Sequence, residues 1–297
     1  MEIHIIFGPT ASSKTKMAQA LWETHHYPIL SVDSRKVYKG ADIGTNKLSL
    51  LEFKNNHPEV LVGGIDFRQP SEEINVYEFQ QHVYGWIEEH HETINKLGGL
   101  IIHGGTGLYL DAILEGKSFL SQRNEELRKA LANESVEKLQ EIAAKENAPA
   151  YEKLNESDRQ NPRRLIRVIE NKNLAPEQID SRSTFFLNSS LTWHIKLPER
   201  LQLYTTINER VYRYFVEGWL DEISSLRSQF GDDSPALRMM GYKQLVAFQN
   251  QYANWSDLYK ENAPEFQEVV SLIQLEHRRY AKRQETWAKK YIRQQKG

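Results

Sequence analysis

The sequence contains no cysteine. Disulfide bonds and thiolate-bound metals are therefore excluded, and we expect any bound metal ion to be held by oxygen ligands. Long apolar runs are also missing, since no segment approaches the roughly 20 apolar residues that cross a bilayer. The first residues lack the basic start and the apolar stretch of a signal peptide. These absences predict a soluble cytoplasmic protein with no membrane partner.

Net charge is almost absent, but basic side chains are unevenly distributed. The formal net charge is −2 at pH 7, which by itself indicates no polyanionic partner. One basic cluster comprises Arg159, Arg163, Arg164 and Arg167, and a second lies near the end of the sequence, with Arg278, Arg279, Lys282, Arg283, Lys289, Lys290, Arg293 and Lys296. Lysine and arginine supply much of the affinity for nucleic-acid phosphates, so both clusters are candidate RNA contacts. The alternative is a solvated helix face.

The order of apolar runs predicts an α/β fold. Runs at residues 3–7, 27–32, 60–62, 99–103 and 191–197 have strand character. Helical spacing covers residues 15–22, 76–97, 203–219, 220–229 and 264–291. Strands alternating with helices indicate a parallel sheet flanked by helices, whose ligands gather at the carboxyl ends of the strands.

A change of character in the middle of the sequence predicts a second, smaller core. A length of 297 residues is long for one core. Short charged helices are expected at residues 124–132, 136–144 and 163–171, with no strand between them. We therefore predict a first part of the core at residues 1–115, an all-helical insertion at 116–191, and a second part of the core at 192–297. Residues 181–190 are polar and are expected to form a loop.

The motif with the clearest chemistry is GPTASSKT at residues 8–15, which follows the first predicted strand and resembles a phosphate-binding loop. Backbone N–H groups of a loop and of the next helix can surround phosphate oxygens, Lys14 adds positive charge, and Thr15 can hold Mg²⁺. Ser13 replaces the usual glycine, which tolerates a backbone conformation that a side chain resists. The phosphate-binding candidates are Gly8, Thr10, Ala11, Ser12, Ser13, Lys14 and Thr15. The alternative is a serine-rich strand-to-helix turn with a solvated lysine.

Several further motifs occur in a characteristic order. Residues 33–38 read DSRKVY, residues 42–45 DIGT and residues 104–109 GGTGLY. Later segments read RRLIRVIE at residues 163–170, GYK at 241–243 and YAKRQETW at 280–287. With the phosphate loop, this set resembles the motifs of the tRNA dimethylallyltransferases, also called isopentenyltransferases. The resemblance spans nearly the whole chain.

The resemblance implies a P-loop NTPase-like fold and a prenyl transfer. A dimethylallyl group would pass from dimethylallyl diphosphate to the exocyclic amine of the adenosine immediately 3′ of a tRNA anticodon, with no ATP consumed. The phosphate loop would hold the diphosphate leaving group, and Mg²⁺ on Thr15 would help to neutralise its growing charge. We expect a monomer whose partners are the donor and the anticodon stem-loop.

The resemblance also implies roles for three further residues. Asp33 matches the general base that accepts the proton of the adenine amine, although a strand-end aspartate can also cap backbone N–H groups. Thr106 matches a donor to the bridging oxygen of the diphosphate, and its alternative is a turn hydroxyl. Arg210 aligns with an arginine that grips the diphosphate in a two-pronged manner, but a surface role is the alternative.

The target adenine must be turned out of its loop, so RNA contacts are required. The resemblance, with the basic clusters, suggests Arg35, Lys36, Arg163, Arg164, Arg167, Lys282 and Arg283. The family more often has glutamine where this chain has Lys36, which favours a phosphate contact there over a base contact. Two more departures are His277, where the family has threonine, and Thr206, where it has arginine.

Three other functions stay open. An adenylate isopentenyltransferase uses free nucleotides and lacks a developed anticodon-loop lobe. A catalytically silent RNA-binding relative is suggested by the change at Ser13. A small-molecule kinase would turn over ATP. The histidine pairs at residues 25–26 and 90–91 have no partner at ligand spacing, so solvated or capping roles are favoured over metal binding.

Overall fold

The computed structural model describes residues 1–116, 124–172 and 180–295. The chain divides into two compact units, one made of Met1–Gly116 with Ser181–Gly297 and one made of Lys117–Asp180. The chain re-enters the first unit at Ser181, earlier than the expected boundary at residue 191. The reason is local structure: the segment expected to be a loop forms the 3-10 turn η1 (Ser181–Ser183) and helix α11 (Thr184–Leu187), with Phe186 in the main core.

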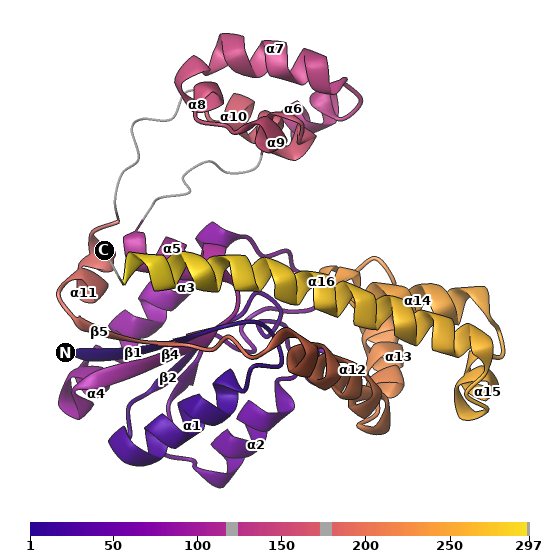
Figure 1. Ribbon diagram of the computed structural model, residues 1–297, viewed down its shortest axis with the longest axis horizontal. Helices are drawn as coiled ribbons and strands as arrows, with labels where there is room; N and C mark the ends of the chain where they lie inside the picture. Colours follow the sequence, from indigo (N-terminus) through magenta and orange to yellow (C-terminus); the bar gives the residue numbers. More distant parts are fainter. Residues whose placement is uncertain (117–123, 173–179, 296–297) are drawn as a thin grey trace. The chain divides into compact units, whose positions relative to one another are not determined.

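The first unit is built on a parallel sheet, as predicted. Its strands are β1 (Glu2–Phe7), β2 (Ile29–Val32), β3 (Val62–Gly63), β4 (Gly99–Gly104) and β5 (Ser190–Ile195), in the order β3-β2-β4-β1-β5 (Figure 1). All the pairings are parallel. Phe7 and Val32 both pair with Gly104, so three central strands end together and their following loops meet. The α/β class is confirmed.

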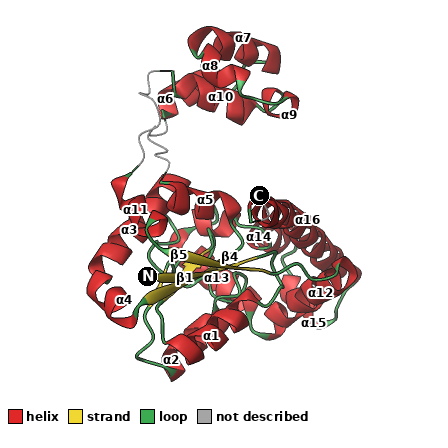
Figure 2. Ribbon diagram, turned by 60° about the vertical axis from the view of Figure 1, so that its left-hand side comes forward, coloured by secondary structure: helices red, strands yellow, loops and turns green. Residues whose placement is uncertain are grey.

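Side chains alternate between the two faces of β1 because successive strand residues point to opposite sides. Ile3, Ile5 and Phe7 belong to the main core, while Ile6 faces a smaller core with α1 (Lys14–His25) and α2 (Leu48–Asn56). The main core also contains side chains of α3 (Val76–Glu89), α5 (Gly107–Glu115) and α16 (Pro264–Gln294). Figure 2 shows these helices on both sides of the sheet.

One expected helix is two helices in the structure. The predicted span 76–97 forms α3 and then α4 (His91–Leu97), because His90 between them leaves the helical region with φ −107° and ψ 14°. The start of α3 is fixed by a capping box, in which Asn75 and Glu78 bond each other's backbone N–H groups. Helices at α2 and α5 were not predicted.

The second part of the core is helical, as expected. It contains α12 (Arg200–Val216), α13 (Trp219–Phe230), η2 (Pro235–Arg238), α14 (Tyr242–Gln251), α15 (Trp255–Lys260) and the long α16. No helix within the described residues is long and apolar enough to cross a membrane.

Two of the family-like motifs pack on one tryptophan. A Cβ on Gly44 would lie 2.2 Å from Trp219 Nε1, and one on Gly241, whose φ is +90°, would lie 2.4 Å from the same indole ring. The Glu222 carboxylate accepts bonds from the backbone N–H groups of Asp42 and Ile43 and from the Tyr242 hydroxyl. These contacts explain why glycine occupies both motifs, and they hold the loop after β2 against α13 and α14.

The second unit is a small helical bundle. It comprises α6 (Glu125–Leu131), α7 (Val136–Glu146), α8 (Ala148–Glu152), α9 (Glu156–Arg159) and α10 (Pro162–Glu170) around a core of Leu131, Leu139, Ala143, Leu165, Val168 and Ile169. The Glu170 carboxylate accepts two bonds from Arg128, at 2.6 and 2.9 Å, and one from Arg167 at 3.3 Å. Helices were expected at α6, α7 and α10.

Candidate active site

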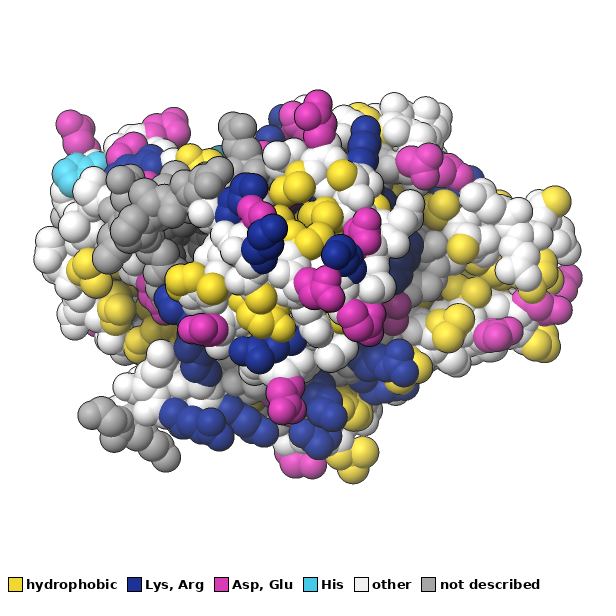
Figure 3. Space-filling model, turned by 90° about the horizontal axis from the view of Figure 1, so that it is seen from above, with side chains coloured by type: hydrophobic (Ala, Val, Ile, Leu, Met, Phe, Trp, Pro, Cys, Tyr) yellow, Lys and Arg dark blue, Asp and Glu magenta, His cyan; other side chains and the backbone are white. Residues whose placement is uncertain are grey.

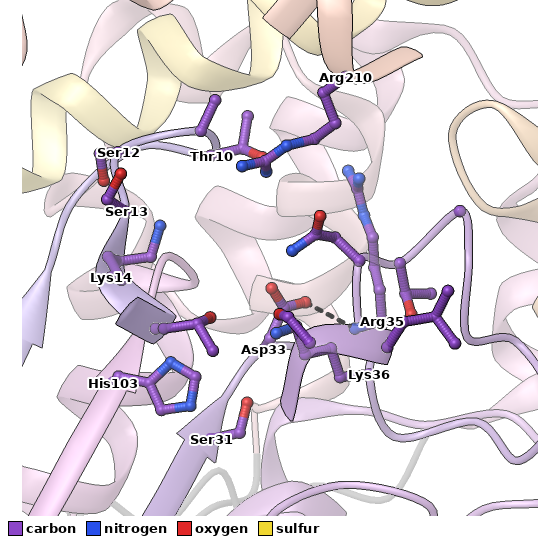
Figure 4. A pocket seen from close by; sticks show the side chains of 18 of the residues that line it. Thr10, Ser12, Ser13, Lys14, Ser31, Asp33, Arg35, Lys36, His103 and Arg210 are labelled. Atoms are coloured by element: carbon purple, nitrogen blue, oxygen red, sulfur yellow. Dashed lines mark hydrogen bonds between the residues drawn. The ribbon is translucent and has the colours of Figure 1, made fainter. Parts of the chain in front are cut away.

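A cavity of about 310 Å³ lies where the carboxyl ends of β1, β2 and β4 meet. Its walls come from the loop after β1, the loop after β2, the end of β4, and helices α12 and α16 (Figure 4). Residues separated by more than 200 positions therefore face one space. The lining includes Thr10, Ala11, Ser12, Ser13, Lys14, Thr15, Asp33, Arg35, Lys36 and Arg210, all of which the sequence singled out.

The phosphate loop adopts an unusual backbone. Ser13, at the position where glycine was expected, has φ 60°, and Ala11 has φ 63°. Both residues are in the left-handed region, which costs a non-glycine residue about 1 kcal/mol or more. Ser12 Oγ donates to Pro9 O at 2.7 Å, and α1 begins directly after Ser13. The serine thus takes the conformation for which glycine is normally selected.

Positive charge dominates the cavity. Six lysine and arginine side chains line it against three carboxylates, Asp33, Glu52 and Glu217. Burial, reinforced by nearby Arg210, lowers the pKa of Lys14 to about 7. Burial also lowers the pKa of Lys36 to about 8, although Asp33 opposes the shift. Cations crowded in this way are stabilised when an anion binds.

Several polar atoms of the cavity wall have no hydrogen-bond partner among the described residues. They are buried and belong to four lining residues: Ser31 Oγ, His103 Nε2, Arg210 Nε and His277 Nε2. Burial lowers the pKa of His277 to about 3 and that of His103 well below its usual value, so both imidazoles are neutral. Because buried polar groups are normally paired, this wall is suited to a polar ligand.

Asp33 and Thr106 follow neighbouring strands but have different surroundings. Asp33 lines the cavity, and its Oδ1 accepts a bond from Arg35 N at 3.0 Å, the local turn that was the alternative to catalysis. Thr106 and Gly8 are not among the lining residues. Thr106 Oγ1 accepts a long bond of 3.4 Å from Ser34 N and also bonds the phenol of Tyr280, which does line the cavity.

Gln284 of α16 ties two loops together, a role that the sequence did not reveal. Its Oε1 accepts from Thr10 N at 2.7 Å, and its Nε2 donates to Gly105 O at 2.9 Å. A Cβ on Gly105 would lie 2.2 Å from Gln284 Nε2, and one on Gly107 would lie 2.3 Å from the Trp287 ring. The glycines after β4 therefore allow α16 to approach the loops closely. Arg210 Nη1 donates to Thr10 Oγ1 at 3.3 Å from the other side.

The expected RNA-contacting residues divide into three groups: Lys36 inside the cavity, the cations on and near α16, and the arginines of α10. Lys36 is only 5% exposed and faces the cavity, because the strand-end turn directs it inward beside Asp33. Arg35 lies 4.3 Å from the centre of the Tyr280 ring, and Arg283 lies 5.5 Å from it. Lysine and arginine side chains gather along one edge of the molecule in Figure 3, and the exposed cations of α16 include Arg279, Lys282, Arg283, Lys289 and Arg293.

The third group lies on α10 in the helical unit. Arg163 and Arg164 are exposed, whereas Arg167 is partly buried. Arg164 pairs with Asp158, and Arg167 pairs with Glu170 at 3.3 Å. Two of the three arginines therefore have acidic partners within their own unit.

Three comparisons relate this chain to known proteins. The model of the IPP transferase family matches residues 36–291. The chain is 31% identical over 291 residues to tRNA dimethylallyltransferase 1 of Parabacteroides distasonis, covering 96% of this chain and 87% of that protein. It is 33% identical over 301 residues to the tRNA dimethylallyltransferase of Bacillus mycoides, covering 96% and 86%.

Two solved structures that resemble this chain are also tRNA-modifying prenyl transferases. The tRNA isopentenylpyrophosphate transferase of Bacillus halodurans is 30% identical, with a TM-score of 0.60, over 96% of this chain and 86% of that one. A eukaryotic dimethylallyltransferase captured acting on tRNA is 20% identical, with a TM-score of 0.70, over 96% and 69%, and so resembles this chain in fold.

Proposed function

This chain belongs to the IPP transferase family, and we propose that its cavity joins dimethylallyl diphosphate to the exocyclic amine of the adenosine 3′ of a tRNA anticodon. The observation that carries the donor assignment is the excess of lysine and arginine side chains over carboxylates in the lining of the cavity. The tRNA assignment comes from the relatives, whose names specify that substrate.

The diphosphate is proposed to bind at the phosphate loop. The N–H groups at the start of α1, the Lys14 ammonium and the Arg210 guanidinium converge on this part of the cavity. Lys14 Nζ donates to Pro9 O at 2.6 Å and would exchange this carbonyl for phosphate oxygens. A preorganised set of donors stabilises the charge that develops as the carbon–oxygen bond breaks.

Mg²⁺ is proposed to bind beside Thr15. The Thr15 hydroxyl lines the cavity and has no hydrogen-bond partner within the described ranges, so it is free to act as a hard oxygen ligand. Magnesium typically takes one or two protein oxygens and completes its shell with phosphate and water. When bound, the ion would neutralise diphosphate charge.

Asp33 is proposed to take the proton. The adenine nitrogen forms a bond to C1 of the dimethylallyl group, the bond from C1 to the diphosphate oxygen breaks with its electron pair, and the amine proton passes to the Asp33 carboxylate. Oδ1 is held by Arg35 N, which fixes the orientation of the carboxylate and leaves Oδ2 for the substrate. Thr106 does not line the cavity, but it bonds the Tyr280 phenol, which does. Its action on the donor is therefore proposed to occur from the side of the cavity where Tyr280 lies.

The RNA is proposed to enter past Tyr280. Two guanidinium groups, those of Arg35 and Arg283, lie within 5.5 Å of the ring centre, so aromatic and cationic groups that can contact a nucleobase turned out of its loop occur together here. The exposed cations of α16, including Lys282 and Arg283, and Arg163 of the helical unit supply candidate phosphate contacts. A monomeric state and a cytoplasmic location stay predictions.

A substrate comparison tests the proposal. The protein is incubated with Mg²⁺ and dimethylallyl diphosphate, and with an anticodon stem-loop RNA, AMP, or ATP without RNA. The expected result is the mass gain of one dimethylallyl group on the RNA adenosine alone. A gain on AMP only would identify a free-nucleotide transferase, and ATP turnover would identify a kinase. RNA binding without any transfer would identify a silent relative.

A further inference from the structure

A cluster of histidines lies on the face of the sheet that packs against α1, near the end of that helix away from the phosphate loop. His4 is in β1, His194 is in the neighbouring edge strand β5, and His25 is the last residue of α1. The ring centre of His4 is 4.9 Å from that of His25 and 5.3 Å from that of His194. Glu2, two residues before His4, points to the same face. Sheet pairing and the return of α1 bring these residues together.

The donor atoms of Glu2, His4 and His25 are close enough to share one ion. One ligand atom from each lies within 4.8 Å of the others, and His4 Nε2 is 3.4 Å from Glu2 Oε1. Ligands on a tetrahedral zinc ion, each about 2.0–2.1 Å from the metal, are separated by roughly 3.3 Å. The spacing of His4 and Glu2 is thus that of two neighbouring ligands, and a small rotation of the half-exposed His25 would complete the set.

His4 provides the second, independent observation. The residue is 5% exposed, and its Nε2 has no hydrogen-bond partner within the described part of the chain. Nδ1 on the other side of the ring lies 3.0 Å from His194 Nε2. One nitrogen is therefore held in place, while the other faces the Glu2 carboxylate, 3.4 Å away, and His25.

Supporting contacts resemble those around metal ligands. Metal-binding histidines usually use their second nitrogen in a hydrogen bond that fixes the ring, as His4 does with His194. The Tyr27 hydroxyl donates to Glu2 Oε2 at 3.3 Å, which leaves Oε1 toward His4.

We propose that Glu2, His4 and His25 form a binding site for a divalent transition-metal ion, with zinc the best fit, and that His194 and Tyr27 position the ligands. Two imidazoles and one carboxylate suit Zn²⁺ rather than Mg²⁺, which prefers oxygen alone. This site would be additional to the Mg²⁺ site proposed beside Thr15, and its two nitrogen ligands differ from the oxygen ligands expected from the sequence. The ion would join the end of α1 to the first half of β1.

Metal titration of the full chain tests this site. Without diphosphate, wild-type protein is expected to bind one Zn²⁺, and Co²⁺ in its place should give the visible absorption of a tetrahedral ion. An ion that binds the native state but not the unfolded state raises the melting temperature. At 100 times its Kd, such an ion increases the free energy of unfolding by about 2.7 kcal/mol. His25→Ala and Glu2→Gln should each weaken binding by roughly 10-fold or more.

The neighbouring histidine provides the control. His26→Asn changes an exposed residue with φ 55°, which asparagine tolerates, and should bind Zn²⁺ as the wild type does. Equal binding by His25→Ala, or an equal loss in His26→Asn, would overturn the proposal. So would a wild-type protein that shows no zinc-dependent rise in melting temperature and no cobalt absorption. Because His25 and Glu2 are partly exposed, circular dichroism can verify that both variants fold.

Discussion

Gln284 Oε1 accepts a hydrogen bond from the backbone N–H of Thr10 at 2.7 Å, which joins the last long helix to the phosphate loop. We expect Gln284→Ala to raise the KM for dimethylallyl diphosphate, because Thr10 N and Gly105 O both lose their partner. Leaving a buried group unpaired costs about 1–3 kcal/mol, so the effect should be roughly 5-fold or more. Steady-state kinetics at saturating RNA measure it.

A matched control lies two residues further along the helix. Thr286 is exposed and bonds only Lys282 O of its own helix, so Thr286→Ala should leave the KM unchanged. A KM in Gln284→Ala equal to the wild-type value would show that the loop keeps its shape without this contact.

Asp33→Asn should slow transfer while leaving RNA affinity intact. An amide of the same shape can still accept from Arg35 N but cannot take up the amine proton. A well-placed base contributes roughly 10²–10⁴-fold, and single-turnover measurements should show a fall of that order. Electrophoretic mobility shifts with the stem-loop measure binding separately. Turnover within a factor of about two of wild type would remove Asp33 from the role of base.

Diphosphate affinity should weaken as the pH rises through 7 and 8. Lys14 and Lys36 have pKa values of about 7 and about 8 in the free cavity, so raising the pH through these values removes positive charge from it. By linkage, an anion that binds raises both pKa values and takes up protons. Calorimetry in buffers of different ionisation enthalpy measures this uptake, and Lys36→Gln should reduce it. Affinity that is constant across this range would contradict the assignment of Lys14 to the diphosphate and any electrostatic effect of the neighbouring Lys36 on it.

Acid should destabilise the protein through its buried histidines. The folded pKa values of His103 and His277 are lowered from 6.5, so below pH 6.5 the unfolded chain binds protons that the folded chain does not. The free energy of unfolding therefore falls with pH below that value, by up to about 1.4 kcal/mol per pH unit for each group. Urea unfolding at several pH values measures the slope. His277→Thr should flatten it, and an unchanged slope would exclude this histidine as a source.

The arginines of α10 should differ in their effect on RNA binding. Arg163 is exposed, whereas Arg167 bonds the Glu170 carboxylate. Arg163→Gln should lower the number of counterions released on RNA binding by about one, as read from the salt dependence of the affinity, without loss of stability. Arg167→Gln should instead destabilise the helical unit, by roughly 1–3 kcal/mol. Filter binding across a salt series and thermal unfolding separate the two, and an identical pattern in both variants would contradict the structural distinction.

The sheet could be predicted because each strand is a short apolar run that ends in a recognisable turn. The five runs and the loop after the first one are local signals, and all five strands are found. The helix α2 was missed because its sequence, LSLLEFKNN, lacks a capping side chain and has only two buried residues. The break at His90 was missed because a single bridging residue interrupts an otherwise continuous helical pattern.

The site was predictable where residues follow strand ends and less so where packing decides. Lys14, Asp33 and Arg210 do face one cavity. The inward direction of Lys36 depends on the turn after β2, and the contacts of Gln284 depend on where α16 lies, neither of which is a local signal. The histidine cluster is the clearest case, because positions 4, 25 and 194 meet only after strands β1 and β5 have paired.

The placement of α16 has a consequence for synthesis of the protein. The phosphate loop is synthesised well before His277, Tyr280 and Gln284, which complete the wall around it. We expect catalytic competence only once α16 has docked, and a truncation before residue 277, which also removes the core side chains Ala288 and Tyr291, should be inactive.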